Sequence, residues 1–196
     1  MPFRIESLSI PDVRVITPTR FDDDRGFFME SYKKSDFGKA GIPGEFCQDN
    51  CSLSRKGVIR GLHYQLEPAA QGKLLRALSG SLYEVAVDIR KGSPTFGKWT
   101  GTLLTVENRS IMWIPPGFAA GVVSLAEDSQ LAYKTTAEYS KDHERGILWN
   151  DPEIGIQWPG GFTNPIVSEK DRRHPRLRDA EVNFVYRSHE RPGAEG

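Results

Sequence analysis

The sequence predicts an all-β sandwich or barrel with a few short helices. Short apolar runs recur along most of the chain, and Gly, Pro, Asn and Asp separate them. The run at 82–89 alternates strictly, so that Tyr83, Val85, Val87 and Ile89 share one face and the even-numbered residues share the other. Helical periodicity is weak. Many short strands between regular turn signals are typical of β-sandwiches and barrels.

The predicted strands follow one another along the chain with short turns between them. They span residues 13–17, 26–32, 58–64, 73–78, 82–89, 99–106, 111–114, 119–125 and 131–136. A further strand is expected around Gln48 and Asn50. Residues 35–40 are expected to form a short helix capped by Ser35, and residues 142–145 a single helical turn. Beyond Trp158 the chain becomes polar, and residues 191–196 are expected to be frayed.

Length and charge restrict the class of protein. The 196 residues fit a single domain spanning 1–196, long enough to bury a core without disulfides. Lys and Arg total 26 and Asp and Glu total 26, so no overall field attracts nucleic acid or a membrane surface. The first ten residues do not resemble a secretory signal, and no apolar run approaches the ~18 residues of a membrane span. The expected location is the cytoplasm.

The two cysteines are predicted to be free thiols. If their segment is a strand, Cys47 and Cys51 lie roughly 13 Å apart, whereas a disulfide needs Cα atoms within about 7 Å. Free thiols suit a reducing compartment. No second cysteine pair exists to complete a metal site.

The central stretch RGLHYQ, residues 60–65, is the strongest candidate for chemistry. A single strand histidine such as His63 is more often a hydrogen-bonded structural residue than a catalytic one. Here other polar residues fall on the same or neighbouring strands, and burying them is costly without a purpose. These are Arg60, Lys73, Arg76, Gln48 and Asn50. Strict alternation places Arg60 and His63 on opposite faces, so both reach one pocket only if the strand bulges at Gly61.

A metal centre is the main rival interpretation of this histidine. Barrel enzymes of the cupin type often bind a metal through a His-x-His pair, a carboxylate and a third histidine. Here the pair would be His63 and Gln65, and the other histidines, His143, His174 and His189, lie in polar late segments. One histidine does not make a site for a first-row metal, so neither a metal nor another cofactor is expected.

Nine short motifs, in order, carry a resemblance to a known family. They are 21–30 (FDDDRGFFME), 48–50 (QDN), 60–65 (RGLHYQ), 71–73 (QGK), 88–90 (DIR), 114–119 (IPPGFA), 133–134 (YK), 149–152 (WNDP) and 168–171 (SEKD). From about residue 13 to residue 171 the chain resembles the dTDP-4-dehydrorhamnose 3,5-epimerases. The resemblance implies a cupin-like jelly roll that is metal-free and works as a homodimer. It also implies epimerisation of C3 and/or C5, beside the C4 ketone of a dTDP-linked 4-keto-6-deoxyhexose.

The resemblance assigns roles that suit this chemistry. Removing a proton beside a ketone requires a base, a cation near the developing enolate oxygen, and an acid on the other face. It implies His63 as the base, Asp171 as its carboxylate partner, Lys73 as the cation and Tyr133 as the acid. Without it, Asp171 would be read as a solvated loop residue, Lys73 as a strand-edge lysine and Tyr133 as a core tyrosine.

The resemblance also implies a set of substrate contacts, to the diphosphate, the sugar and the base, with Tyr139 stacking on thymine. They are Arg25, Glu30, Gln48, Asp49, Asn50, Arg60, Ala120, Tyr139, Glu144 and Lys170. Arg25 and Glu30 are expected to reach the partner's site, through N-terminal strands exchanged in the dimer.

One position departs from the family pattern. Where the family has Gly-Phe-Ala-His-Gly, this chain has Ala120 in place of the histidine. Losing one oxyanion donor can raise a barrier by ~2.7–4 kcal/mol, so a slower reaction, a changed substrate or epimerisation of one carbon all remain open. Three competing functions suit the same fold, namely a keto-sugar isomerase, a non-catalytic sugar-nucleotide-binding jelly roll and a metal-dependent cupin oxygenase.

Overall fold

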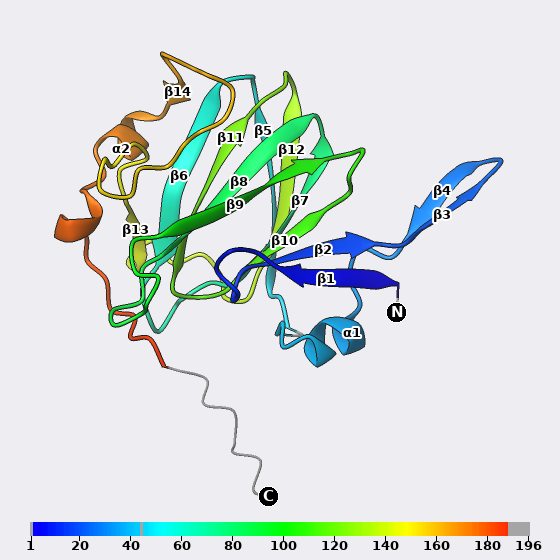
Figure 1. Ribbon diagram of the computed structural model, residues 1–196, viewed down its shortest axis with the longest axis horizontal. Coiled ribbons are helices and arrows are strands. Elements are labelled where there is room, and N and C mark those ends of the chain that lie inside the picture. Colours follow the sequence, from blue (N-terminus) through cyan, green and yellow to red (C-terminus); the bar gives the residue numbers. More distant parts are fainter. Residues whose placement is uncertain (1, 44, 188–196) are drawn as a thin grey trace, which may run out of the picture.

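Two β-sheets face each other and form a sandwich (Figure 1). This is a computed structural model, and it describes residues 2–43 and 45–187. In spatial order, the first sheet contains β1 (Phe3–Ser7), β2 (Arg14–Pro18), β10 (Ile111–Ile114), β7 (Lys73–Ser79), β12 (Ser129–Thr135) and β5 (Gln48–Ser54). The second contains β13 (Glu144–Gly146), β6 (Val58–Gln65), β11 (Phe118–Ser124), β8 (Ser81–Asp88) and β9 (Trp99–Thr105), with β14 (Ile166–Val167) beside β6.

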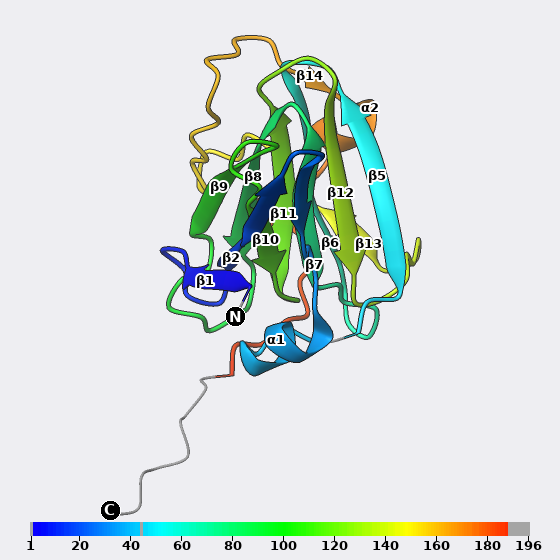
Figure 2. The same cartoon turned by 90° about the vertical axis from the view of Figure 1, so that its right-hand side faces the viewer.

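The remaining elements lie outside the sandwich. Strands β3 (Arg20–Asp23) and β4 (Gly26–Met29) form a hairpin that projects from the body (Figure 1). Helix α1 (Lys34–Lys39) lies at one end of the first sheet, as Figure 2 shows. Helix α2 (Glu169–Arg172) and a 3₁₀ turn (Leu177–Asp179) belong to the C-terminal segment. The predicted all-β class with a few short helices is therefore confirmed.

Three apolar layers explain why the chain folds this way. Leu75 and Met112 of the first sheet pack with Leu82 and Phe118 of the second, and so fill the space between the sheets. The outer face of the first sheet is covered by Phe37 of α1 and its neighbours. The outer face of the second sheet is covered by the C-terminal segment, whose apolar side chains pack on β6, β8 and β11.

Strand β8 follows the alternation that its sequence predicts. Leu82 and Ala86 point between the sheets, whereas Val85, Val87 and Ile89 pack under the C-terminal segment. The even-numbered face also carries Glu84, whose carboxyl group is therefore directed into the sandwich.

Several sequence predictions at the edges of the fold are wrong. The predicted helical turn at 142–145 holds only in part, because residues 142 and 143 lie in a turn but Glu144 and Arg145 belong to β13, which pairs with β6. The residue preceding α1 is Lys33, and Ser35 lies inside the helix and does not cap it. The predicted strand at 26–32 ends at Met29. Edge strands β1 and β3 were missed because charged residues interrupt their apolar pattern, and the expected frayed end, 191–196, lies outside the described residues.

The cysteines and the helices agree with the sequence expectations. Cys47 and Cys51 are both free, as predicted, and both are exposed. Within the part of the chain that the structure describes, no helix has the length and apolar character needed to cross a membrane.

Candidate active site

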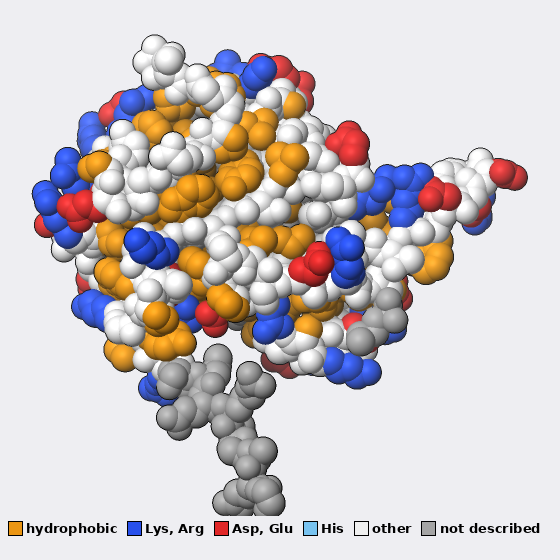
Figure 3. Space-filling view, in the orientation of Figure 1, with side chains coloured by type: hydrophobic (Ala, Val, Ile, Leu, Met, Phe, Trp, Pro, Cys, Tyr) orange, Lys and Arg blue, Asp and Glu red, His pale blue; other side chains and the backbone are white. Residues whose placement is uncertain are grey.

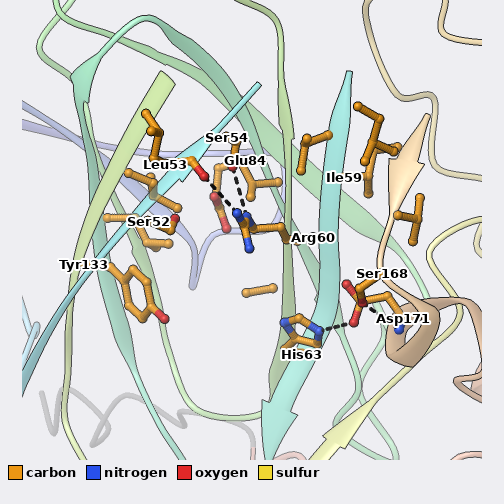
Figure 4. A pocket seen from close by; sticks show the side chains of 18 of the residues that line it. Ser52, Leu53, Ser54, Ile59, Arg60, His63, Glu84, Tyr133, Ser168 and Asp171 are labelled. Atoms are coloured by element: carbon orange, nitrogen blue, oxygen red, sulfur yellow. Dashed lines mark hydrogen bonds and ion pairs between the residues drawn. The ribbon is translucent and has the colours of Figure 1, made fainter. Parts of the chain in front are cut away.

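A cavity of about 870 Å³ opens between the two sheets. Figure 4 shows Arg60 and His63 on one wall, Tyr133 on the opposite wall, and Asp171 behind the histidine ring. Lys73 lines the same cavity. A side recess of about 380 Å³ shares His63, Lys73 and Tyr133 with this cavity. The sandwich thus brings together the four predicted catalytic residues, which are far apart in the sequence.

A bulge in β6 lets Arg60 and His63 face the same cavity. The pairing of β6 with β11 shifts register between Ala120 and Val122, opposite the Arg60–His63 segment. Gly61 has a φ of +119°, and a Cβ there would lie 2.7 Å from the carbonyl oxygen of Ala120. Only glycine fits this backbone, so the predicted bulge at Gly61 is confirmed.

His63 and Asp171 form a hydrogen-bonded pair. The His63 Nε2 atom lies 2.7 Å from Oδ1 of Asp171, and the backbone N–H of Gly61 donates to Oδ2 of the same carboxylate at 3.2 Å. Helix α2 holds Asp171 in place, because its backbone N–H donates to the Oγ atom of Ser168 at 3.1 Å. Asp171 is buried, which excludes the reading of this residue as a solvated loop aspartate.

The electrostatics of Asp171 favour its ionised form. Burial alone raises the pKa of Asp171, but its hydrogen bonds and the nearby imidazoles outweigh burial and lower the pKa below its usual value. A carboxylate at Oδ1 accepts a hydrogen bond from Nε2–H of His63, and this fixes the tautomer in which Nδ1 is unprotonated. Nδ1 points toward the Tyr133 side of the cavity in Figure 4. The pair can therefore present a base to a molecule bound there.

Lys73 supplies a cation beside the histidine. Its Nζ atom donates to the backbone carbonyl of His63 at 3.3 Å. Burial lowers the pKa of Lys73, while the charges of Glu84 and Glu144 act in the opposite direction. An ammonium group held this close to the base can stabilise an oxyanion that forms on the same substrate.

Tyr133 faces the histidine from the opposite wall. Its strand, β12, places Leu131 and Tyr133 on the cavity side, and Figure 4 shows the hydroxyl directed across the cavity. Burial raises the pKa of Tyr133, and the Glu84 charge adds to this rise while Arg60 opposes it. The phenol therefore stays protonated near neutral pH and can deliver a proton to a strong base such as an enolate.

Most of the predicted substrate contacts lie around these four residues. Arg60 reaches across to β5, where its Nε donates to Ser54 Oγ at 2.9 Å. Four further predicted contacts form a connected group. Gln48 accepts a hydrogen bond from the Tyr139 backbone at 2.7 Å, the Tyr139 hydroxyl donates to Glu144 at 2.9 Å, and Glu144 pairs with Lys170. Gln48, Asn50, Tyr139 and Glu144 line the side recess, and Lys170 lines the cavity.

Three predicted contacts lie away from the cavity within this chain. Arg25 sits at the tip of the β3–β4 hairpin, paired with Asp23 and almost fully exposed. Glu30 follows the same hairpin. Asp49 points to the outer face of the first sheet and pairs with Lys134 at 2.8 Å, because alternation on β5 separates it from Gln48 and Asn50. Arg76, one of the three cations expected on the strands around His63, also lines a recess on that outer face.

Ala120 lies beside the His63–Asp171 pair. It is opposite His63 on β6 and opposite Ala86 on β8, and it lines the cavity. The small side chain of Ala120 leaves the cavity open at the position opposite His63.

Sequence reasoning missed two residues of this site. Glu84 lines the cavity, and only the strict alternation of β8 indicated its direction. His174 approaches from the C-terminal segment, with its Nε2 atom 3.4 Å from Asp171 and its ring 5.7 Å from that of His63. Its place in a polar late segment gave no sign of this.

The position of His174 also corrects the sequence argument about metals. The donor atoms of His63, Asp171 and His174 lie within 4.8 Å of one another, a donor set that could hold a transition metal. The 2.7 Å between His63 and Asp171 is nevertheless a hydrogen-bond distance. Two ligands of one tetrahedral ion, each ~2.0–2.1 Å from it, stand about 3.3 Å apart. The geometry therefore fits a shared proton better than a shared ion.

The fold and the site together define a jelly-roll protein whose cavity contains a hydrogen-bonded histidine–aspartate pair, an arrangement suited to acid–base chemistry. The profile of the dTDP-4-dehydrorhamnose 3,5-epimerase family matches residues 7–179. The chain belongs to this family, and it is an isomerase that acts on carbohydrates.

Individual relatives support the assignment over nearly full length. The dTDP-4-dehydrorhamnose 3,5-epimerase of Shigella flexneri is 54% identical, over 88% of this chain and 94% of its own. The structure of a dTDP-6-deoxy-D-glucose-3,5-epimerase from Legionella pneumophila, in complex with dTDP-4-keto-L-rhamnose, superposes with a TM-score of 0.90 at 41% identity. That match covers 95% of this chain and all of the other. A 3′-monoepimerase from Streptomyces bikiniensis, in complex with dTDP-quinovose, gives a TM-score of 0.83 at 31% identity and covers 88% and 87% of the two chains.

Proposed function

We propose that this protein inverts C3 and C5 of a dTDP-linked 4-keto-6-deoxyhexose by removing and returning a proton at each carbon. The observation that carries the proposal is the arrangement of His63 and Tyr133 on opposite walls of one cavity, with Lys73 beside the histidine. A base and an acid on opposite faces are what an inversion at carbon requires.

Each group has one task in this reaction. Nδ1 of His63 takes the proton from the carbon beside the ketone, and Asp171 stabilises the imidazolium that forms. The electron pair moves onto the C4 oxygen, where the Lys73 ammonium stabilises the negative charge. Tyr133 then returns a proton to the opposite face of the same carbon. No step requires a metal or another cofactor.

The nucleotide would be bound by charged and aromatic groups around the cavity. Arg60 and Lys170 offer cations to a diphosphate. Tyr139, of which 55% is exposed, offers a flat ring at the entrance of the side recess on which a base can stack. The relatives with bound dTDP-sugars carry this class of ligand on the same fold. Free cysteines suit a reducing compartment, which supports a cytoplasmic location.

A proton-NMR experiment in deuterated water tests this function and the role of Ala120 together. The C3 and C5 proton signals of a dTDP-linked 4-keto-6-deoxyhexose should both disappear, and an epimer should accumulate. Binding of the sugar nucleotide without loss of either signal would support a non-catalytic binding protein.

Because Ala120 removes a hydrogen-bond donor near the ketone, whose oxygen carries the charge of both enolates, we expect exchange at C3 and at C5 to be slowed. Ala120→His should accelerate both exchanges by up to about 10²-fold, the lower end of what one oxyanion donor contributes. Ala120→Leu, which fills the same space without a donor, is the control and should give no gain. No acceleration in Ala120→His would contradict the role of Ala120 and leave the epimerase function intact.

We also propose that the β3–β4 hairpin completes the cavity of a second copy in a homodimer. The hairpin stands clear of the body in Figures 1 and 3. It exposes Phe21, Phe27 and Phe28 to 55%, 54% and 65%. Exposed aromatic rings on a projecting arm indicate a surface that another chain covers. The arm also carries Arg25, and Glu30 follows it, so docking of the arm would bring both residues to the partner.

Replacing Phe21 and Phe28 with serine should therefore convert the dimer to a monomer and reduce turnover at least about tenfold. Light scattering during size-exclusion chromatography gives the mass, and the exchange assay gives the turnover. Phe96→Ser is the matched control, because Phe96 is 41% exposed but lies outside the hairpin. A dimer that survives the double substitution would show that the arm does not hold the subunits together.

A further inference from the structure

A buried carboxyl group faces the cavity and has no assigned task. Glu84 is 2% exposed, and its Oε2 atom has no hydrogen-bond partner among the described residues. It lies in the middle of β8, opposite Val122 of β11, which in turn is opposite Arg60 of β6. Both Glu84 and Lys73 line the cavity. A buried carboxyl group without a partner costs stability, so its retention here calls for a functional reason.

Lys73 is the group that a carboxylate at this position would serve. The proposed reaction requires the Lys73 side chain as an ammonium, because a neutral amine cannot balance the charge of an enolate. Burial acts against the ammonium by lowering the pKa of Lys73, and the charge of Glu84 is the strongest influence that raises it again.

The titration of Glu84 suits this task. Burial raises the pKa of Glu84 to about 8, and the Lys73 charge acts against that rise. Glu84 therefore becomes a carboxylate as the solution turns alkaline, which is the condition under which Lys73 is at risk of losing its proton.

We propose that Glu84 is a positioning residue for Lys73: its carboxyl group is buried in the wall of the cavity that Lys73 also lines, and as a carboxylate it keeps the Lys73 side chain an ammonium against the enolate oxygen. The inference rests on the proposed function, since it assigns Lys73 the same task. It adds that the carboxyl group of Glu84 keeps the buried Lys73 side chain positively charged.

Other charged groups around Lys73 leave this role to Glu84. Glu144 of β13 also favours the ammonium, but it is already paired with Lys170 and hydrogen-bonded by Tyr139. Arg60 of β6 carries a positive charge, and His63 gains one when it takes a proton from the substrate, so both disfavour a further positive charge nearby. Tyr133 of β12 is a neutral phenol near neutral pH, because its pKa is raised.

The test is the pH dependence of deuterium incorporation at the substrate carbons, measured for the unaltered protein, Glu84→Gln and Glu84→Asp. Glutamine keeps the size and polarity of the side chain but cannot become negative. We expect the alkaline loss of activity in Glu84→Gln to begin at least about one pH unit lower than in the unaltered protein. Glu84→Asp retains the negative charge, so its alkaline loss of activity should begin within about half a pH unit of that of the unaltered protein.

A second pair of variants identifies the group through which Glu84 acts. Arginine does not titrate in this range, so Lys73→Arg and Lys73→Arg/Glu84→Gln should lose activity at the same alkaline pH. A shift that persists in the arginine background would assign the effect to Tyr133 and overturn the inference. If Glu84→Gln leaves the alkaline loss of activity at the original pH and only raises the KM, Glu84 is a sugar contact. That result would also overturn the inference. Failure of the unaltered protein to exchange at any pH would instead refute the proposed function.

Discussion

Asp171→Asn is expected to lower the rate of proton abstraction about 10²–10⁴-fold while the fold remains intact. The reason is the direction of two hydrogen bonds. Oδ2 of Asp171 accepts from the Gly61 backbone at 3.2 Å, and an asparagine oxygen can replace it there. The asparagine NH₂ group then faces Nε2 of His63, which must become an acceptor. The proton moves to Nδ1, and the ring no longer presents a base to the cavity.

Deuterium incorporation at C3 and C5 measures this loss, and thermal unfolding reports on the fold. Glu169→Gln is the matched control, because Glu169 lies on the same short helix but its carboxylate is exposed and paired with Arg173. Its activity should equal that of the unaltered protein. Full activity in Asp171→Asn would show that the carboxylate does not orient the base.

Tyr133→Phe is expected to separate proton removal from inversion. The phenyl ring preserves the packing beside Leu131, whereas the hydroxyl that faces His63 is lost. His63 can still remove the proton and return one to the same face, so substrate should gain deuterium within about tenfold of the normal rate. Formation of the epimer should fall about 10²–10⁴-fold, the usual contribution of a positioned general acid.

Chromatographic separation of substrate and epimer, followed by mass analysis of each, distinguishes the two rates. Tyr83→Phe provides the control, since Tyr83 lies on the opposite face of β8 and packs with Ile59 and Val123. Equal losses of exchange and of epimer formation in Tyr133→Phe would assign the tyrosine to substrate binding or to the first step.

Much of the sandwich could be predicted because its central strands show a regular alternation of side chains and are separated by turn residues. The alternation in β8 placed every side chain on the correct face, and turn residues separated the central strands. The short edge elements could not be predicted in the same way. β13 has the sequence Glu-Arg-Gly, which contains no apolar residue, and only its pairing with β6 makes it a strand. Tertiary context decided its conformation.

In the site, too, local sequence patterns predicted some residues, whereas the others depend on tertiary contacts. The proximity of His63 to Arg60 was predictable, because Gly61 offered the only local means of turning both side chains to one face. Asp171 was expected only through the family resemblance, because its neighbours in sequence are charged and nothing local indicates burial. Glu84 and His174 were missed because their importance depends on distances between sheets and segments that a sequence does not contain.

The most direct test of the account is a comparison of the unaltered protein with His63→Ala, each incubated with a dTDP-linked 4-keto-6-deoxyhexose in deuterated water. Mass spectrometry of the recovered sugar nucleotide should show added deuterium with the unaltered protein and about 10²–10⁴-fold slower labelling with the variant. Labelling that proceeds equally fast without the imidazole would contradict the claim that His63 is the base.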